Sequence, residues 1–183
     1  MKNFKNYISL ISEETRIPEK LVERFLDGNE KLPQDFAEEI SDYIHRNLDD
    51  NFSLDKNEYL RSTYVDDATI EKYESEYGDP WFIRDRSLEP LGICKGDIVY
   101  VIDADFFSNG ELMCIDFYGA TGVTCELTNN GDGTHTASFP NKEYGDIHIG
   151  FEAFTDVYDV LTKVVAYRHF ADENDTVGTV IKL

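Results

Sequence analysis

The sequence predicts an α+β fold, in which a small N-terminal helical region precedes a mostly-β domain. Apolar residues recur at spacings of three and four through the first fifty residues, which is the period of amphipathic helices. From residue 81 the pattern changes to short β-branched and aromatic runs between turn residues, which indicates strands. Hydrophobic residues make up 41% of the 183 residues, which is enough for a packed core.

Three short helices are expected within residues 1–50. Proline is tolerated in a first helical turn and glycine is favoured just after a last one. Pro18 and Pro33 therefore indicate where the second and third helices begin, and Gly28 where the second ends. Three apolar faces are expected, formed by Phe4, Tyr7, Ile8 and Ile11, then Leu21, Val22, Phe25 and Leu26, then Phe36, Ile40, Tyr43, Ile44 and Leu48. Such helices with tight connections form either a small bundle or a helix-turn-helix.

Residues 51–80 are predicted to be an acidic linker, because they hold few apolar anchors. One short helix is expected near residues 67–77, and Gly78-Asp79-Pro80 is expected to be the turn that ends the linker. An all-β domain then fills residues 81–183, with strands expected at 97–102, 111–118, 123–127, 134–139, 146–151 and 157–167. Their near-regular spacing predicts a compact, curled sheet.

Charge is the most unusual feature of the composition. Seventeen Lys and Arg residues face 37 Asp and Glu residues, which gives a formal net charge of −20 spread over both halves of the chain. Acidic composition most often serves solubility. A second interpretation is a surface that imitates nucleic acid for a basic partner, since such a field repels phosphates and attracts cations.

The cysteines and histidines give no sign of a metal or redox centre. Cys94, Cys114 and Cys125 are odd in number and lack CxxC spacing, which predicts reduced thiols in a cytoplasmic protein without a secretion signal. The histidines show no metal-ligand spacing either, so neither a metal site nor a cofactor is predicted. No run reaches the roughly 18 apolar residues of a membrane helix, so no membrane partner is expected.

Five short motifs in the C-terminal half carry a resemblance to a known family. They are Arg86-Ser87-Leu88-Glu89-Pro90, the run Cys94 to Val101 with its Gly96-Asp97 step, Gly110-Glu111-Leu112, the segment with Asn141, Glu143 and Tyr144, and Leu161-Thr162-Lys163-Val164-Val165. In this order and spacing they resemble the LexA and phage-repressor family, whose β domain has a serine-protease fold and mediates dimerisation. Thr162 stands where that family usually has glycine.

The resemblance implies a nucleophile without its base. In the family a serine attacks a peptide bond while a neutral lysine accepts its proton, and Ser87 matches the serine. The lysine position falls on Cys125, beside Glu126, and the Ala-Gly or Cys-Gly dipeptide that the family cleaves does not occur in the chain. We therefore expect a LexA-like fold that forms a homodimer, with no enzymatic activity and no catalytic residues.

The N-terminal region resembles the helix-turn-helix of phage-type repressors over residues 15–28, followed by Leu32-Pro33. A recognition helix presents cationic and amide side chains to phosphates and base edges. The candidate DNA-binding residues are Arg16, Lys20, Arg24 and Asn29. Acidic side chains interleave with them, at Glu19, Glu23 and Asp27, and each would weaken the attraction to phosphate.

Two functions follow as expectations. The first is a repressor-like regulator of a phage or mobile element, which binds DNA and dimerises through a non-cleaving LexA-like domain. The second is an acidic phage-encoded inhibitor on a repressor scaffold, such as an anti-CRISPR protein that blocks the DNA channel of a CRISPR nuclease, a basic nucleic-acid-binding enzyme. The order of the two domains favours the first, whereas the charge and the missing lysine favour the second.

Overall fold

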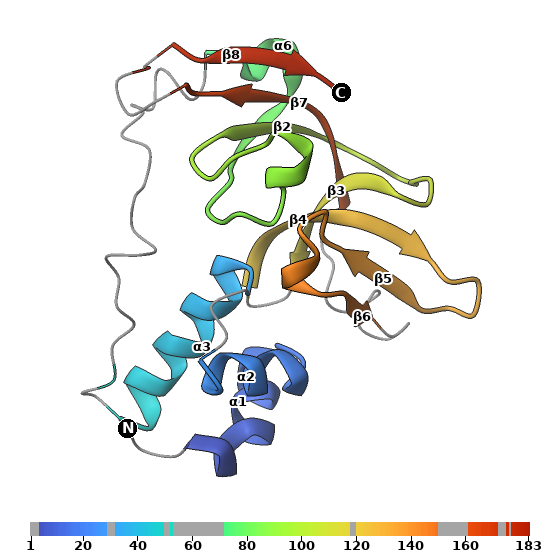
Figure 1. Cartoon of the computed structure of the whole chain (residues 1–183). Helices are drawn as coiled ribbons and strands as arrows, with labels where there is room; N and C mark the ends of the chain where they lie inside the picture. The colour runs from blue at the N-terminus through green and yellow to red at the C-terminus, as the bar shows by residue number, and fades with distance from the viewer. Residues whose placement is uncertain are drawn as a thin grey trace.

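The computed structural model describes residues 4–28, 32–49, 52, 72–117, 120–149, 161–171, 175 and 177–183. The fold is α+β, as the sequence predicts: N-terminal helices are followed by an antiparallel sheet of eight strands. Figure 1 shows the helices at one end of the sheet, with the C-terminal strands at the other.

The helical elements of the N-terminal region are η1 (Phe4–Tyr7), α1 (Ile8–Thr15), α2 (Glu19–Leu26) and α3 (Gln34–Asn47). Pro18 and Pro33 are the residues immediately before α2 and α3, which confirms the predicted helix starts. Gly28 has φ 76°, the left-handed conformation expected of a glycine just past a helix end. The short helix expected near residues 67–77 is described as α6 (Glu74–Tyr77), whereas residues 53–71 of the predicted linker lie outside the described residues.

The strands are β1 (Asp79–Phe82), β2 (Ile98–Asp103), β3 (Glu111–Phe117), β4 (Ala120–Asn129), β5 (His135–Ser138), β6 (Ile147–Ile149), β7 (Leu161–His169) and β8 (Thr179–Lys182). They follow the order β1-β2-β7-β3-β4-β5-β6, and β8 pairs with β7. The start of β7 lies between β2 and β3, and its end lies between β2 and β8.

Two edge strands differ from the sequence prediction. β1 begins at Asp79, inside the predicted turn, because Pro80 lies in an edge strand, where a missing N–H donor is tolerated. The chain enters β1 through Gly78, whose φ is 104° and where an added Cβ would lie 2.1 Å from the Val101 carbonyl oxygen. Glycine is therefore required there. The four-residue strand β8 was not predicted, since it is short and exposed on most of its length.

The helices and one face of the sheet share a hydrophobic core. The largest buried cluster combines Val22, Phe36 and Ile40 of the helices with Cys125 and Leu127 of β4. A second cluster fills the opposite side of the sheet, between β2, β7 and the connection from β1 to β2. In the described part of the chain, the helical region is therefore packed onto the β domain rather than held apart from it.

Candidate functional site

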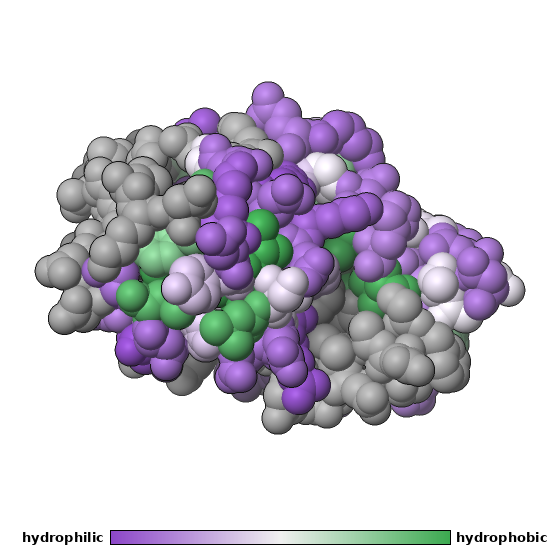
Figure 2. Space-filling model, turned by 90° about the horizontal axis from the view of Figure 1, so that it is seen from below, coloured by the Kyte–Doolittle hydropathy of each residue, from purple (hydrophilic) through white to green (hydrophobic). Residues whose placement is uncertain are grey.

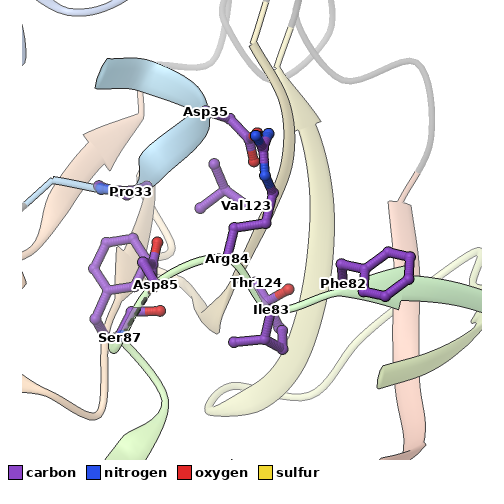
Figure 3. Close-up of a pocket in the computed structure, with 10 residues that line it drawn as sticks. Pro33, Asp35, Phe82, Ile83, Arg84, Asp85, Ser87, Val123 and Thr124 are labelled. Atoms are coloured by element: carbon purple, nitrogen blue, oxygen red, sulfur yellow. Dashed lines mark hydrogen bonds and ion pairs between the residues drawn. The ribbon is translucent and has the colours of Figure 1, made fainter. Parts of the chain in front are cut away.

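A pocket lies where the start of α3 meets the β1–β2 connection and β4 (Figure 3). Its described lining residues are Pro33, Asp35, Phe82, Ile83, Arg84, Asp85, Ser87, Val123, Thr124 and Phe139. The pocket therefore contains Ser87, the residue that the family resemblance matches to a nucleophile, at the junction between the helical and β parts.

Ser87 is held by backbone hydrogen bonds from two directions. It is 4% exposed, and its backbone N–H donates to Asp85 Oδ1 at 2.8 Å. Its carbonyl oxygen accepts from the Asn141 backbone N–H at 2.9 Å, and the Tyr144 hydroxyl accepts from the Arg86 N–H at 3.1 Å. The fold thus brings together two of the motifs on which the resemblance rests, although more than fifty residues separate them.

The predicted lysine position does not supply a base. Cys125 is fully buried in the core cluster shared with the helices, and this burial raises the pKa of its thiol. Its neighbour Thr124 lines the pocket with Ser87 instead, and its hydroxyl donates to Cys114 Sγ at 3.6 Å. The described lining residues include no lysine. A serine hydroxyl without an assisting base is a poor nucleophile at neutral pH.

Arg84 is the one cation among the described lining residues, and it is paired with carboxylates of α3. Its guanidinium lies 2.6 Å from Asp35 Oδ1 and 2.7 Å from Glu38 Oε1. Burial lowers the pKa of Arg84, but the two carboxylates together hold it above its ordinary value. Burial also raises the pKa of Asp35 to about 6, although Arg84 opposes this shift. Figure 3 shows Arg84 reaching from the β1–β2 connection to the helix, so its role is to join the two.

The candidate DNA-binding residues lie in different environments. Arg16 and Lys20 are exposed, at the turn between α1 and α2 and at the start of α2. Arg24 is partly buried, which lowers its pKa, and an added Cβ at Gly145 would lie 3.6 Å from its Nη1. Arg24 therefore faces the β part of the molecule. Asn29 lies outside the described residues.

The exposed side of α2 carries both signs of charge. Glu19, Glu23 and Asp27 are exposed together with Lys20, and Asp27 forms an ion pair with Lys5 of η1. Figure 2 views the molecule from the helical end, where hydrophilic side chains cover most of the coloured surface and apolar ones appear as patches between them. The exposed side of α2 is therefore not uniformly charged in either sign.

One cluster of chemically active side chains has no counterpart in the sequence prediction. Cys94, Asp97 and His169 place their ligand atoms within 4.8 Å of one another. Asp97 and His169 are 72 residues apart, and only the pairing of β2 with β7 brings them together. The spacing of these residues along the sequence therefore gives no sign of the cluster.

No protein-family model matches this chain, and no curated protein matches it. Of the helices that the structure describes, none has the length and apolar character needed to cross a membrane.

Proposed function

We propose that this chain is a repressor-like regulator of a phage or mobile element that binds DNA through α1 and α2. The observation that carries the proposal is the connection between these helices, a three-residue turn from Arg16 to Pro18. Arg16 opens it in the left-handed conformation, with φ 61°, and Ile17 is buried beneath it. Two short helices joined by such a turn are typical of a helix-turn-helix, in which the second helix enters the major groove.

The proposal assigns different roles to the cations of this region. Arg16 and Lys20 would contact phosphates or base edges, because both are exposed. Arg24 would instead fix α2 against the β part, near Gly145. Glu19 and Glu23 lower the affinity of a single α2 for DNA, so two copies in a dimer are needed to concentrate enough positive charge on one operator.

We assign to the β domain a LexA-like fold that dimerises and does not cleave. The contacts between Arg86 and Tyr144 and between Ser87 and Asn141 support this, since they join motifs of the family. The pocket at Ser87 supports the loss of cleavage, because its described cation, Arg84, is neutralised by Asp35 and Glu38.

A gel shift with the DNA upstream of the coding sequence tests the proposal. At low salt we expect a specific shift that competitor DNA of unrelated sequence does not remove, and that weakens steeply as salt is raised. Lys20→Ala should weaken the shift, whereas Lys182→Ala, which removes an exposed cation from β8, should not. Equal loss in the two variants, or no shift with the wild type, would contradict DNA binding through α2.

A second function is favoured by one observation, the exposed acids on α2. The exposed acids are Glu19, Glu23 and Asp27, and they belong to a chain with 37 acidic and only 17 basic residues. An inhibitor on a repressor scaffold, such as an anti-CRISPR protein, would present them to the basic DNA channel of a nuclease. A pull-down with basic nucleases tests this: a stoichiometric complex that excludes DNA, together with no gel shift, would select the inhibitor.

A further inference from the structure

Cys94, Asp97 and His169 form a cluster that shares no residue with the Ser87 pocket. Cys94 and Asp97 lie in the turn before β2, and His169 is the last residue of β7. Ile98 and Arg168 are paired in the β2–β7 ladder, so Asp97 and His169 are adjacent at the next step. His169 Nδ1 lies 3.0 Å from Asp97 Oδ2 and 3.1 Å from Oδ1.

The backbone holds this cluster in place. The turn from Cys94 to Asp97 closes with a 3.0 Å hydrogen bond from the Asp97 N–H to the Cys94 carbonyl, and Gly96 supplies the positive φ that the turn needs, 97°. The Asp97 carboxylate accepts from the Cys94 N–H at 2.7 Å and from the Phe170 N–H at 3.2 Å. The carboxylate is therefore fixed before any ligand arrives, and Asp97 is only 1% exposed.

The chemistry of these groups suits a metal ion. A thiolate, an imidazole and a carboxylate are all zinc ligands, and three protein ligands with one open position form a common zinc site.

We propose that Cys94, Asp97 and His169 bind a zinc-type divalent cation through Sγ, a carboxylate oxygen and Nδ1. Donor atoms around tetrahedral zinc lie about 3.5 Å apart, so the 4.8 Å spread of the cluster must contract by about 1 Å. Rotation of the half-buried Cys94 side chain provides this movement. Binding displaces the thiol proton to the buffer and forms the sulfur–metal bond.

The bound ion would join the end of β7 to the turn before β2. It would thereby stabilise the pairing of β2 with β7, since an ion that binds only the folded state raises the unfolding temperature. This inference does not depend on DNA binding, because the cluster shares no residue with α2 or with the Ser87 pocket.

Titration of the full-length protein with cobalt(II) tests the site. Cobalt takes the place of zinc, and bonding to a thiolate gives an intense near-ultraviolet charge-transfer band. We expect one equivalent per chain to develop the band and zinc to abolish it. Cys94→Ser should remove the band. His169→Gln should weaken cobalt binding by about 10-fold or more. His148→Gln is the matched control and should bind like the wild type, because this exposed histidine lies on β6.

A second readout covers the case in which a variant folds poorly. At the same zinc concentration, zinc should raise the thermal midpoint of the wild type and of His148→Gln, and raise that of His169→Gln by less. Surface carboxylates can also bind cobalt, but without the thiolate band. Cobalt binding by the wild type without that band would therefore overturn the proposal. A band that persists in Cys94→Ser, and thus comes from another cysteine, would also overturn it.

Discussion

At the scale of single residues, three side chains lie in unusual environments. Arg16 adopts φ 61°, which a non-glycine residue seldom does. Asp35 is a mostly buried acid whose pKa is raised to about 6. Ser87 is buried without a lysine among the described residues of its pocket. Each state gives a prediction that a single substitution can check.

Arg16→Gly should raise stability while it weakens DNA binding. Glycine adopts the left-handed conformation without the steric cost of about 1 kcal/mol that a side chain incurs. Part of this gain is lost to the greater entropy of the unfolded chain, so we expect a net gain below 1 kcal/mol by urea denaturation. If DNA affinity rises with stability, Arg16 does not contact DNA.

Asp35 should make the protein lose stability as pH rises from about 4 to about 6. The pKa of Asp35 is about 6 in the folded state, above the ordinary value of 3.8, so the folded state binds the proton more tightly than the unfolded state does. This difference stabilises the folded state at low pH, and the stabilisation is lost once Asp35 is ionised in both the folded and the unfolded state. In Asp35→Asn, the free energy of unfolding should no longer show this fall with pH, which is about 3 kcal/mol when the pKa shift is converted to free energy.

The measurement is the free energy of unfolding in urea at several pH values between 4 and 7. Asp42→Asn replaces an exposed acid of the same helix and should keep the wild-type pH dependence. Parallel curves for the wild type and Asp35→Asn would show that burial does not raise the pKa of Asp35.

Ser87→Ala should leave the behaviour of the chain at alkaline pH unchanged. Self-cleavage needs a neutral base beside the hydroxyl, and the described pocket offers only the ion-paired Arg84 as a basic group. Both the wild type and the variant should therefore stay a single band on a denaturing gel after prolonged incubation. Two fragments from the wild type alone would return hydrolysis as the leading function.

At the scale of elements, the joint between α3 and the β1–β2 connection depends on one carboxylate. Asp85 Oδ2 accepts from the Gln34 N–H at 3.2 Å, and Oδ1 accepts from the Ser87 N–H at 2.8 Å. Asp85 thereby caps the start of α3 from a distant segment, where the N-cap residue Pro33 provides no side-chain cap.

Asp85→Ala should lower the free energy of unfolding by about 1–2 kcal/mol, the usual effect of losing a helix cap. Urea denaturation followed by circular dichroism measures it. Asp105→Ala, at an exposed acid of the β2–β3 loop, should change stability by less than about 0.5 kcal/mol. Equal effects in the two variants would mean that the cap contributes nothing.

The elements also show how far the sequence alone predicts this molecule. Helix starts at Pro18 and Pro33 and the hairpin between β4 and β5 follow from local conformational preferences, and the structure confirms them. The edge strands β1 and β8 escaped prediction because pairing with β2 and β7, not their own sequence, makes them strands. The orientation of Arg24 and the meeting of Cys94 with His169 depend on tertiary packing, which no local pattern contains.

At the scale of the whole molecule, the helices and the sheet should unfold together. Val22, Phe36 and Ile40 share the largest buried cluster with residues of β4, so separating the two parts would expose the core that they share. Circular dichroism of the helices and fluorescence of Trp81 on β1 should give the same urea midpoint. Loss of the helical signal at lower urea would show that the helical region is an independent domain.

The net charge sets the conditions under which such a molecule can bind DNA. At −20 the chain as a whole repels phosphates, so binding must come from a few exposed cations that are close to the duplex. Arg16 and Lys20 are the described residues placed for this, on the turn and on α2.

Fluorescence anisotropy of a labelled upstream duplex, titrated with wild type and with Arg16→Ala/Lys20→Ala at several salt concentrations, tests the central claim most directly. The account predicts specific binding by the wild type. In the double variant the slope of log affinity against log salt should be shallower by about two, one for each lost phosphate contact. Recognition of DNA through α2 would be contradicted if the wild type does not bind the duplex, or if the double variant has the same slope as the wild type.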